Sequence, residues 1–564
     1  MPEHDVLIIG AGLAGQRAAL AAAQSGVSVA IMSKVHPVRS HSVAAAGGIN
    51  AAISVSDDWR SHAYDTVKGS DYLGDQDAIE AMCREAPGEV MHLEHIGVTF
   101  HRNDAGELDL RAFGGASINR TAYVADITGQ AILHVLYEQL MRNASTVARY
   151  EEWFVTSLLI DDGGSCTGVV ARHIRSGAME TFAAKSVILA SGGAGQCFKP
   201  TTNALICTAD GLAQALRAGA PLMDMEMIQY HPTTLLENGL LITEGARGEG
   251  AHLLNKDGER FMSKAAPNKM ELASRDVVSR AEQIEINEGR GVGPDGQGVY
   301  LDITVVPRKR TLEALREIVN IGRDFAGVDI TREPIIIRPG QHYIMGGVKT
   351  DIQGQTPIAG LYAAGEVACV SVHGGNRLGA NSLLDTLIFG RRAGEDAAER
   401  ARSTPMPACS DAQLRNDERM IAEIMARPRK GRRISELKNE LGTTMNRYCA
   451  VFREADGLQS AYGTVKRLQE EAQNAYIDDR GTVFNQDVLG AIELGYMLET
   501  AEAIVLSAID RKESRGAQFR TDFPERNDAE WLKHINVALG EDGSPEISYS
   551  PVTITQWRPE ERTY

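Results

Sequence analysis

The sequence predicts an α/β protein: a Rossmann-like nucleotide-binding domain that an α+β domain interrupts, followed by a helical bundle and an irregular C-terminal tail. Three observations predict this fold. Residues 5–32 read as strand, glycine-rich turn, helix and strand. Two further strands end at glycines much later in the chain, near residues 190 and 365. Residues 410–510 show helical periodicity and few strand signals.

The first unit opens with a short apolar strand at residues 5–9 and the turn GAGLAG (Gly10, Ala11, Gly12, Leu13, Ala14, Gly15). Gly10 allows the tight turn, Gly12 lets the backbone approach a pyrophosphate, and Gly15 lets helix and strand pack closely. The helix that follows would point its free N–H groups at the phosphates. This context favours nucleotide binding, and the alternative is a glycine-rich turn that binds nothing.

The segment after the second strand favours FAD over NAD. The strand ends in Ser33 and Lys34, where an NAD-binding fold usually has an acidic residue for the ribose. Residues 36–48, HPVRSHSVAAAGG, then bring small side chains and a double glycine, which let the backbone come close to a flat group. His41 lies in this loop, although its residue type alone is more typical of a surface histidine.

Two later turns repeat the strand-to-glycine pattern. The strand at residues 186–190 runs into SGGAG, and the strand at residues 360–366 ends in Glu366, an acid that suits a ribityl or ribose hydroxyl. Turns so far apart predict an insertion. We therefore expect an FAD-binding domain in two parts (residues 1–223 and 343–400), a capping domain (224–342), a helical domain (401–515) and a tail (516–564).

Composition narrows the function. A net charge of −17 without a long basic run argues against nucleic-acid binding. The seven cysteines are scattered and none has CxxC spacing, so we expect no zinc site, iron–sulfur cluster or other bound metal in this chain. Neither an export signal nor a membrane-spanning segment is expected. An anionic substrate would need positive charge gathered locally at its site.

Cationic and hydrogen-bonding residues occur in five clusters among small residues. A dicarboxylate needs two donor sets, one for each end, and arginine suits a carboxylate because its fork can bond in a bidentate manner. For any single arginine, a surface or interdomain ion pair explains the residue at least as well. The clusters contain His231 and Thr233; Thr243, Glu244 and Arg247; Arg275 and Asp276; His342 and Tyr343; and Asn376 and Arg377.

The chain resembles the flavoprotein subunits of succinate dehydrogenase and fumarate reductase over nearly its whole length. Many motifs, in one order, carry the resemblance. They are GAGLAG, RSHSVAAAGG, KGSDYLGDQDAI at 68–79, FGG at 113–115, HPT, LITEGARGEG, GERF, SRDVV, HYIMGGV, GLYAAGE, NRLGANSLLD, ESRG at 513–516, WLKH and the final RTY.

This resemblance implies a covalent bond between His41 and the 8α-methyl group of FAD, which would raise the reduction potential of the flavin. It also implies FAD contacts at residues 10–15, in the loop that follows the second strand, and at four later positions. The residues beyond the first turn are Ser33, Lys34, Ser40, Ser42, Gly47, Gly48, Asp210, Glu366, Ser382 and Leu383.

The resemblance further implies a site for succinate and fumarate. His231 and Thr243 would hold one carboxylate, and His342 and Arg377 the other. Arg275 would exchange a proton with the substrate carbon while a hydride passes to or from flavin N5, and Glu244 is placed for a proton relay. An arginine in this position needs such a relay because its own pKa is far above neutrality.

Partners are implied as well. Because the chain lacks cluster-spacing cysteines, electrons would leave through a separate iron–sulfur subunit and then a membrane quinone-binding subunit. These partners would hold the chain at the cytoplasmic face of the membrane. The direction of the reaction, the quinone and the number of membrane subunits stay open.

Two alternatives remain. An L-aspartate oxidase-like soluble flavoenzyme shares the fold, but His41 and the tail with WLKH argue against it. A flavin-binding electron-transfer or assembly protein would not need the substrate side chains. Two departures from the family pattern also stand out. Gln518 replaces a frequent histidine, which puts a relay role there in doubt, and the loop after Gly115 is shorter than in some members.

Overall fold

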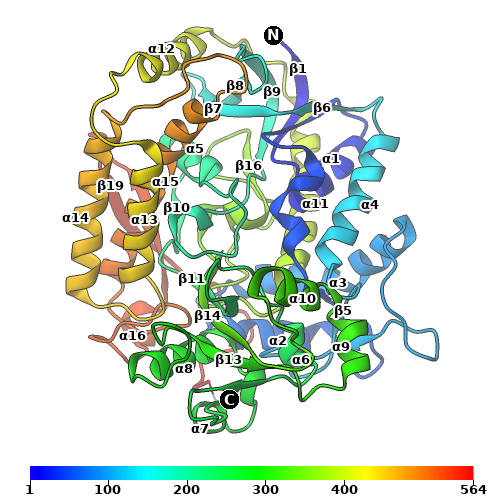
Figure 1. Cartoon of the computed structure of the whole chain (residues 1–564). Helices are drawn as coiled ribbons and strands as arrows, with labels where there is room; N and C mark the ends of the chain where they lie inside the picture. Colours follow the sequence, from blue (N-terminus) through cyan, green and yellow to red (C-terminus); the bar gives the residue numbers. More distant parts are fainter. Residues whose placement is uncertain (563–564) are drawn as a thin grey trace.

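The computed structural model describes residues 1–562, which form an α/β protein with four sheets. In Figure 1 the nucleotide-binding sheet lies at the top, a helical region on the left, and the segment around residues 224–342 at the bottom. Among residues 1–562, we find no helix with the length and apolar character that crossing a bilayer requires.

The largest sheet has seven strands in the order β6-β2-β1-β9-β8-β7, with β16 also paired to β9. Its parallel half joins β1, β2, β6, β9 and β16, whereas β8 pairs antiparallel with β9, and β7 pairs antiparallel with β8. The strands are β1 (Glu3–Ile9), β2 (Val29–Ser33), β6 (Val147–Glu151), β7 (Trp153–Ile160), β8 (Cys166–His173), β9 (Met179–Leu189) and β16 (Leu361–Ala363). The strand–turn–helix–strand unit that the sequence predicts is thus present at the centre of the sheet.

Two helices far apart in sequence, α1 (Leu13–Gln24) and α11 (Asn381–Ser403), pack closely against each other. Glycines on α11 make this possible. A Cβ atom at Gly390 would lie 2.6 Å from the Ala14 carbonyl oxygen, and one at Gly394 would lie 2.3 Å from that of Ala18. The close contact brings the N-terminal ends of both helices to the same cavity, which is described below.

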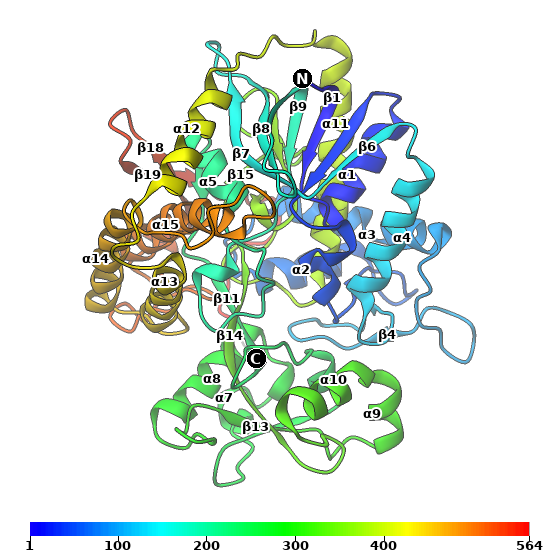
Figure 2. The same ribbon diagram turned by 45° about the horizontal axis from the view of Figure 1, so that its top comes forward.

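A four-stranded antiparallel sheet, β11-β14-β13-β12, forms the core of the lower segment. Its strands are β11 (Ile228–Leu235), β12 (His252–Leu254), β13 (Val299–Asp302) and β14 (Ile335–Ile344), and the helix α8 (Arg275–Asn287) packs against it. Figure 2 shows this segment set apart from the rest, with β11 and β14 as the strands that lead into it. Side chains that these elements carry therefore face the main body from one side.

Four helices occupy the region with helical periodicity: α12 (Ala412–Ala426), α13 (Ile434–Tyr448), α14 (Ala455–Ala472) and α15 (Gln486–Asp510). Helix α15 packs against α13 and α14, and also against α5 (Asp210–Arg217) of the nucleotide-binding part. The helical region is therefore anchored next to Asp210.

The prediction of an irregular tail was wrong. A short helix α16 (Asp528–Trp531) is followed by a hairpin of β18 (Lys533–Leu539) and β19 (Pro545–Pro551). Strand β18 pairs with β10 (Leu222–Met223), inside a five-stranded sheet of order β17-β15-β10-β18-β19. The buried Ile535 and Val537 hold it there. A seven-residue strand has few residues to show alternation, and its pairing partner lies more than 300 positions earlier in the chain.

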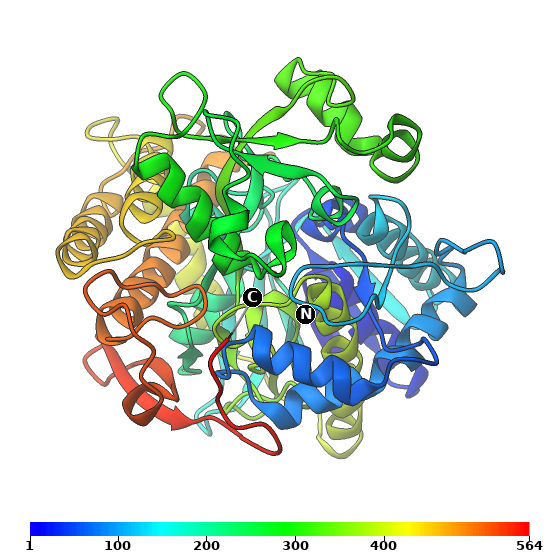
Figure 3. The same cartoon turned by 90° about the horizontal axis from the view of Figure 1, so that it is seen from below.

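The end of the tail returns to the first part of the chain. Figure 3 shows it running beside the helices α2 (Trp59–Gly69) and α3 (Gln76–Ile96). The Gln76 side-chain oxygen accepts hydrogen bonds from three backbone N–H groups between residues 555 and 557. Arg562 then bridges Asp71 (3.0 Å) and Asp276 (2.8 Å), which joins α8 to the main body.

Candidate functional site

One large cavity lies where the nucleotide-binding sheet, the start of α11 and the strands β11 and β14 meet. Residues from distant parts of the chain line it, including every predicted substrate residue. Of the residues singled out from the sequence, the lining contains Gly10, Ala11, Gly12, Leu13, Ala14, Ser33, Lys34, Ser40, His41, Ser42, Gly47, Gly48, Asp210, His231, Thr243, Glu244, Arg275, His342, Glu366, Arg377, Ser382 and Leu383.

Gly15 is the predicted cofactor contact that does not line this cavity. A Cβ atom at Gly15 would lie 1.9 Å from the Gly10 carbonyl oxygen. The missing side chain therefore lets α1 pack on the turn that precedes it, which is the role that the third glycine of the motif predicts. Gly15 therefore shapes the turn next to the cavity.

The N-terminal end of α1 forms one end of the cavity. Gly10 has a φ of 112°, and a Cβ atom there would lie 2.1 Å from the Ala190 carbonyl oxygen, so only glycine fits the turn. Gly12 precedes the helix without a side-chain cap. The first N–H groups of the helix, with the hydroxyls of Ser40 and Ser42 close by, fit the phosphates of a dinucleotide.

His41 lies in the short helix η2 (His41–Ala44) at the cavity wall. Its Nδ1 accepts a hydrogen bond from the Ala204 N–H at 3.3 Å, which leaves Nε2 for another bond. Burial lowers the pKa of His41 to about 4, so the imidazole is neutral near pH 7. In the neutral tautomer that accepts at Nδ1, the ring carries its one proton on Nε2.

Acidic residues close the cavity at other points. The Asp210 carboxylate is held by the Lys34 ammonium at 2.7 Å, and Lys34 also binds Glu493 at 3.0 Å. Glu366 accepts a hydrogen bond from the Ile344 N–H at 3.2 Å, and burial raises its pKa to about 7. Glu366 is therefore only partly ionised near pH 7, and its side-chain oxygens can accept a hydrogen bond from a hydroxyl.

Two histidines face each other across the other end of the cavity. The His231 and His342 rings have centroids 4.9 Å apart. Nδ1 of His231 accepts the Thr233 N–H at 3.2 Å, and Nδ1 of His342 lies 2.8 Å from the Thr202 hydroxyl. Burial, followed by the Arg275 charge, lowers the pKa of both rings well below the usual value. Both rings are therefore neutral near pH 7, and His231, whose Nδ1 accepts, carries its proton on Nε2.

Arg377 is buried at 2% exposure beside these rings. Its guanidinium carbon lies 4.5 Å from the centre of the Tyr343 ring, and its Nε has no hydrogen-bond partner among residues 1–562. Burial, followed by repulsion from Arg275, lowers its pKa to about 9. A buried cation without a carboxylate partner is costly, and an anion in the cavity would offset that cost.

Arg275 and Glu244 form an ion pair between α8 and the start of α6 (Gly245–Gly248). Nε of Arg275 lies 2.7 Å from Oε2 of Glu244, and Nη1 donates to the Gln229 side-chain oxygen at 3.0 Å. Arg247 lies 3.6 Å from the same Glu244 oxygen. Burial alone would raise the pKa of Glu244, but Arg275 and Arg247 outweigh it and hold the pKa below the usual value. This carboxylate links two guanidinium groups.

Some residues of the site were not singled out from the sequence. The Gln229 side chain accepts a hydrogen bond from the Arg275 guanidinium and donates one to the Arg377 backbone carbonyl oxygen at 2.8 Å, so it links the Arg275 side chain to the backbone at Arg377. Thr202 orients His342, and the Gly114 N–H donates to Glu244 at 2.6 Å. Gln229 could have been nominated from the sequence because it lies two residues before His231. No feature of the sequence around Thr202 indicates its contact with His342.

Gln518 lies away from the cavity. Its side chain is buried, accepts a hydrogen bond from Arg453 and donates to the Ala508 carbonyl oxygen at 3.2 Å. It is therefore a link between the tail and the helical region. The loop after Phe113 does reach the site, through the Gly114 contact and through the Gly115 N–H, which donates to the Leu272 carbonyl oxygen at 3.1 Å.

Comparison with known proteins gives consistent matches along the chain. Residues 5–383 match the model of the FAD binding domain family, and residues 438–564 match the fumarate reductase flavoprotein C-terminal family. The succinate dehydrogenase flavoprotein subunit of Rickettsia conorii is 44% identical, with 98% of this chain and 96% of that protein covered. The fumarate reductase flavoprotein subunit of Mycobacterium tuberculosis is 45% identical, with 100% and 99% covered. A solved mutant of the E. coli quinol fumarate reductase subunit FrdA superimposes with a TM-score of 0.96 at 39% identity, with 100% and 99% covered.

Proposed function

The chain belongs to the family of succinate dehydrogenase and fumarate reductase flavoprotein subunits. We propose that it interconverts succinate and fumarate with the side chains that line the cavity. It is an FAD-binding oxidoreductase. The names of these relatives favour this function over an L-aspartate oxidase-like one. One observation supports the proposed site most strongly. Arg377, Arg275 and two neutral histidines line the same cavity as the glycine-rich turn.

FAD fits the lining residues. The uncapped start of α1 suits its pyrophosphate, Glu366 suits a hydroxyl, and the second helix end in the cavity, with Ser382 and Leu383, suits an electron-rich ring edge. When bound, FAD supplies the hydride donor or acceptor. We propose that the Nε2 atom of His41 bonds the flavin covalently, since Nδ1 is already engaged by Ala204.

The substrate is held at both ends by the chain's own donors. His231 and Thr243 bind one carboxylate, and His342 and Arg377 bind the other. Fixing both ends restricts the reacting carbons to one place beside the flavin, which supplies much of the rate through orientation. The same donors stabilise negative charge that develops on the substrate during transfer. Neutral histidines suit this role because they add donors without further repulsion of Arg275 and Arg377.

Arg275 handles the proton on the substrate carbon. Its contact with Glu244 gives the proton a route away from the cavity, and Gln229 fixes the guanidinium plane from the other side. Glu244 stays ionised because two arginines flank it. An ionised Glu244 can take a proton from the Arg247 guanidinium and pass it to Arg275. Arg275 is thus re-protonated after each turnover of fumarate reduction.

We propose an iron–sulfur subunit and a membrane quinone-binding subunit as partners, with the chain at the cytoplasmic face of the membrane. A solved quinol-fumarate reductase with menaquinol molecules superimposes with a TM-score of 0.95 and covers 99% of this chain, which supports a quinone-linked assembly. Purification from the native source, with iron determined on the purified complex, tests this. Recovery of an active single chain without iron would contradict the partner proposal.

The assay of the FAD-loaded chain tests the activity. We expect succinate-dependent reduction of a dye and fumarate-dependent oxidation of a reduced viologen, and no turnover of L-aspartate. Turnover of L-aspartate in place of succinate would support the alternative flavoenzyme. Flavin binding without turnover of either acid would support an electron-transfer or assembly protein.

A further inference from the structure

The last described residues form a strap on the surface of the main body. Strand β19 ends at Pro551, and residues 552–562, which we name the C-terminal strap, then run beside α2 and α3 (Figure 3). Most residues of the strap are exposed, so apolar burial supplies little of the free energy that holds it. Polar contacts therefore decide its course.

Gln76, the first residue of α3, fixes the middle of the strap. Its backbone N–H donates to the Thr553 carbonyl oxygen at 3.0 Å, and its side-chain amide donates to the Trp557 carbonyl oxygen at 2.6 Å. Its side-chain oxygen accepts the three backbone N–H groups of residues 555–557 at 2.9 to 3.1 Å. One side chain that is 1% exposed thus sets the path of the strap backbone.

Arg562 lies beyond this anchor and joins the main body to α8. Its Nη2 atom lies 3.0 Å from Oδ2 of Asp71 and 2.8 Å from Oδ2 of Asp276. Asp71 follows α2 in the main body, whereas Asp276 is the second residue of α8. Two buried carboxylates from different parts of the fold therefore share one guanidinium nitrogen.

The two carboxylates would repel each other without this cation. Burial alone would raise the pKa of Asp71 and of Asp276, but Arg562 is the strongest of the charges that outweigh it, and both values lie below the usual one. Both groups are therefore ionised near pH 7. Removal of Arg562 would leave two like charges facing each other across the contact between α8 and the main body.

Asp276 is the immediate neighbour of Arg275. Its carboxylate also accepts the Ser274 hydroxyl at 2.5 Å and the Arg280 guanidinium at 3.0 Å, so it holds the chain on both sides of Arg275. A displacement of Asp276 would carry the Arg275 backbone with it. Misplacement of a reacting group by about 1 Å can lower a rate about 10²-fold.

We propose that Arg562 is a positioning residue for the proposed reaction: through Asp276 it holds the start of α8, and with it Arg275, against the main body. This inference rests on the proposed function. Arg377 and the glycine-rich turn belong to the main body, whereas Arg275 is carried by α8, so the link sets how the proton donor faces the bound substrate and flavin. The strap delivers Arg562 to the place between the two carboxylates.

Arg562→Gln tests the link itself. In the FAD-loaded full chain, with reduced viologen as electron donor, we expect kcat for fumarate reduction to fall about tenfold while KM changes less than about threefold, because Arg275 loses its alignment. The effect of heavy water on kcat should increase, since proton transfer becomes slower. Arg562→Lys keeps a positive charge between the carboxylates and should regain part of the rate.

Gln76→Ala tests the strap from its other end. It removes the anchor of the strap and leaves both carboxylates in place, so it should lower kcat as Arg562→Gln does, and the double variant should be no slower than either single one. Additive losses would overturn the proposal. Arg526→Gln is the matched control: Arg526 binds Asp71 at 2.9 Å and Asp528 at 3.0 Å, both outside α8, and the variant should keep wild-type kcat.

Amide hydrogen exchange in the chain without FAD gives a readout that does not depend on turnover. Residues 278–281 contain the first hydrogen-bonded N–H groups of α8, and their exchange should be about tenfold faster in Arg562→Gln and Gln76→Ala, while α15 keeps the wild-type rate. Wild-type kcat and exchange in Arg562→Gln, or faster exchange throughout the chain, would overturn the proposal. Neither result touches the proposed function, which fails if the wild-type chain turns over neither acid.

Discussion

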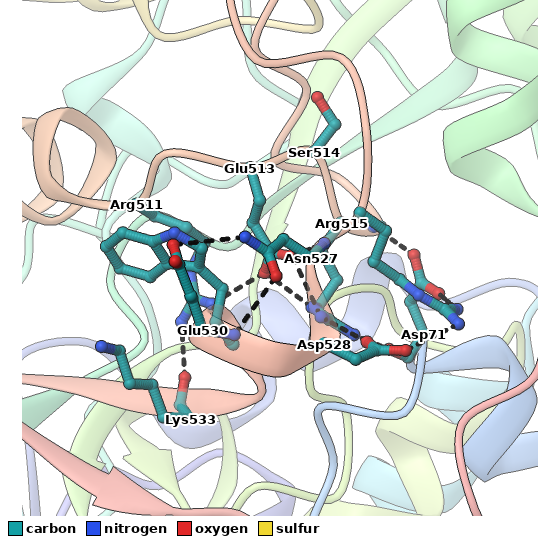
Figure 4. A network of polar contacts seen from close by, with 12 residues as sticks. Asp71, Arg511, Glu513, Ser514, Arg515, Asn527, Asp528, Glu530 and Lys533 are labelled. Carbon is teal, nitrogen blue, oxygen red and sulfur yellow. Dashed lines mark hydrogen bonds and ion pairs between the residues drawn. The ribbon is translucent and has the colours of Figure 1, made fainter.

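Two groups of buried arginines show what separates a structural charge from a binding charge. The tail network around Arg511 and Arg515 matches each guanidinium with carboxylates and carbonyl oxygens (Figure 4). Arg511 binds Glu226 at 2.6 Å and Glu513 at 3.1 Å, and Arg515 binds Glu513 at 2.7 Å. In the cavity, by contrast, Arg377 has no carboxylate ion pair within the described chain.

The electrostatic consequences of the two arrangements are opposite. Burial alone would lower the pKa of Arg511, but Glu226, Asp224 and Glu513 outweigh it and raise the pKa. For Arg377, burial and Arg275 act in the same direction, and its pKa falls to about 9. Arg511, whose partners are built in, holds the fold together. Arg377 lacks such partners, so a bound anion would stabilise it.

Removal of Arg377 gives the largest expected effect on activity. Arg377→Gln should lower kcat/KM for fumarate about 10³-fold, on the order of 4 kcal/mol, because one carboxylate of the substrate loses its charged donor. The free energy of unfolding should not decrease, since no protein carboxylate loses a partner. Urea denaturation and steady-state kinetics measure the two quantities. A destabilised variant with normal kcat/KM would place Arg377 with the structural arginines.

The converse change belongs to the tail network. Glu513→Gln should lower the free energy of unfolding by about 3 kcal/mol, because two fully buried arginines lose a shared partner. Asp528→Asn is the matched control: Asp528 binds Arg515 at 2.7 Å but is 33% exposed, so its loss should cost less than about 1 kcal/mol. Equal losses in the two variants would show that the network is not a set of buried pairs.

His41 tests whether the cavity side chains act on the flavin. Acid precipitation of wild type should leave the flavin with the protein, whereas His41→Ser should bind FAD and release it in acid. We expect succinate oxidation by this variant to fall about tenfold more than fumarate reduction, since an unlinked flavin of lower potential accepts electrons less readily. Flavin release from the wild type would contradict the covalent bond.

The most gradual expected effect is a pH dependence of stability in the tail. Burial alone would lower the pKa of His534, but Asp224 and Asp75 outweigh it and raise the pKa to about 10, above the usual 6.5. Its contribution to stability is therefore complete below pH 6.5 and is lost as the pH rises to about 10, by at most about 1.4 kcal/mol per pH unit. His534→Gln should remove this slope. An identical slope in the variant would assign it to other groups.

The sequence by itself determined the parts of the protein that depend on neighbouring residues. The GAGLAG turn, the strands on both sides of it and the helices between residues 410 and 510 follow from local periodicity and glycine placement. Residue types and motif order were enough to nominate His41, His231, Arg275 and Arg377, and the cavity brings these residues together.

Only the tertiary structure decided which charges are paired. Arg515 donates to the Asp71 carbonyl oxygen across 444 positions, and β18 pairs with β10 across more than 300, so no local pattern predicts either contact. The same holds for Gln229 between Arg275 and Arg377. An arginine in a sequence carries the same charge wherever it lies, and its role depends on desolvation and on partners that folding brings from far along the chain.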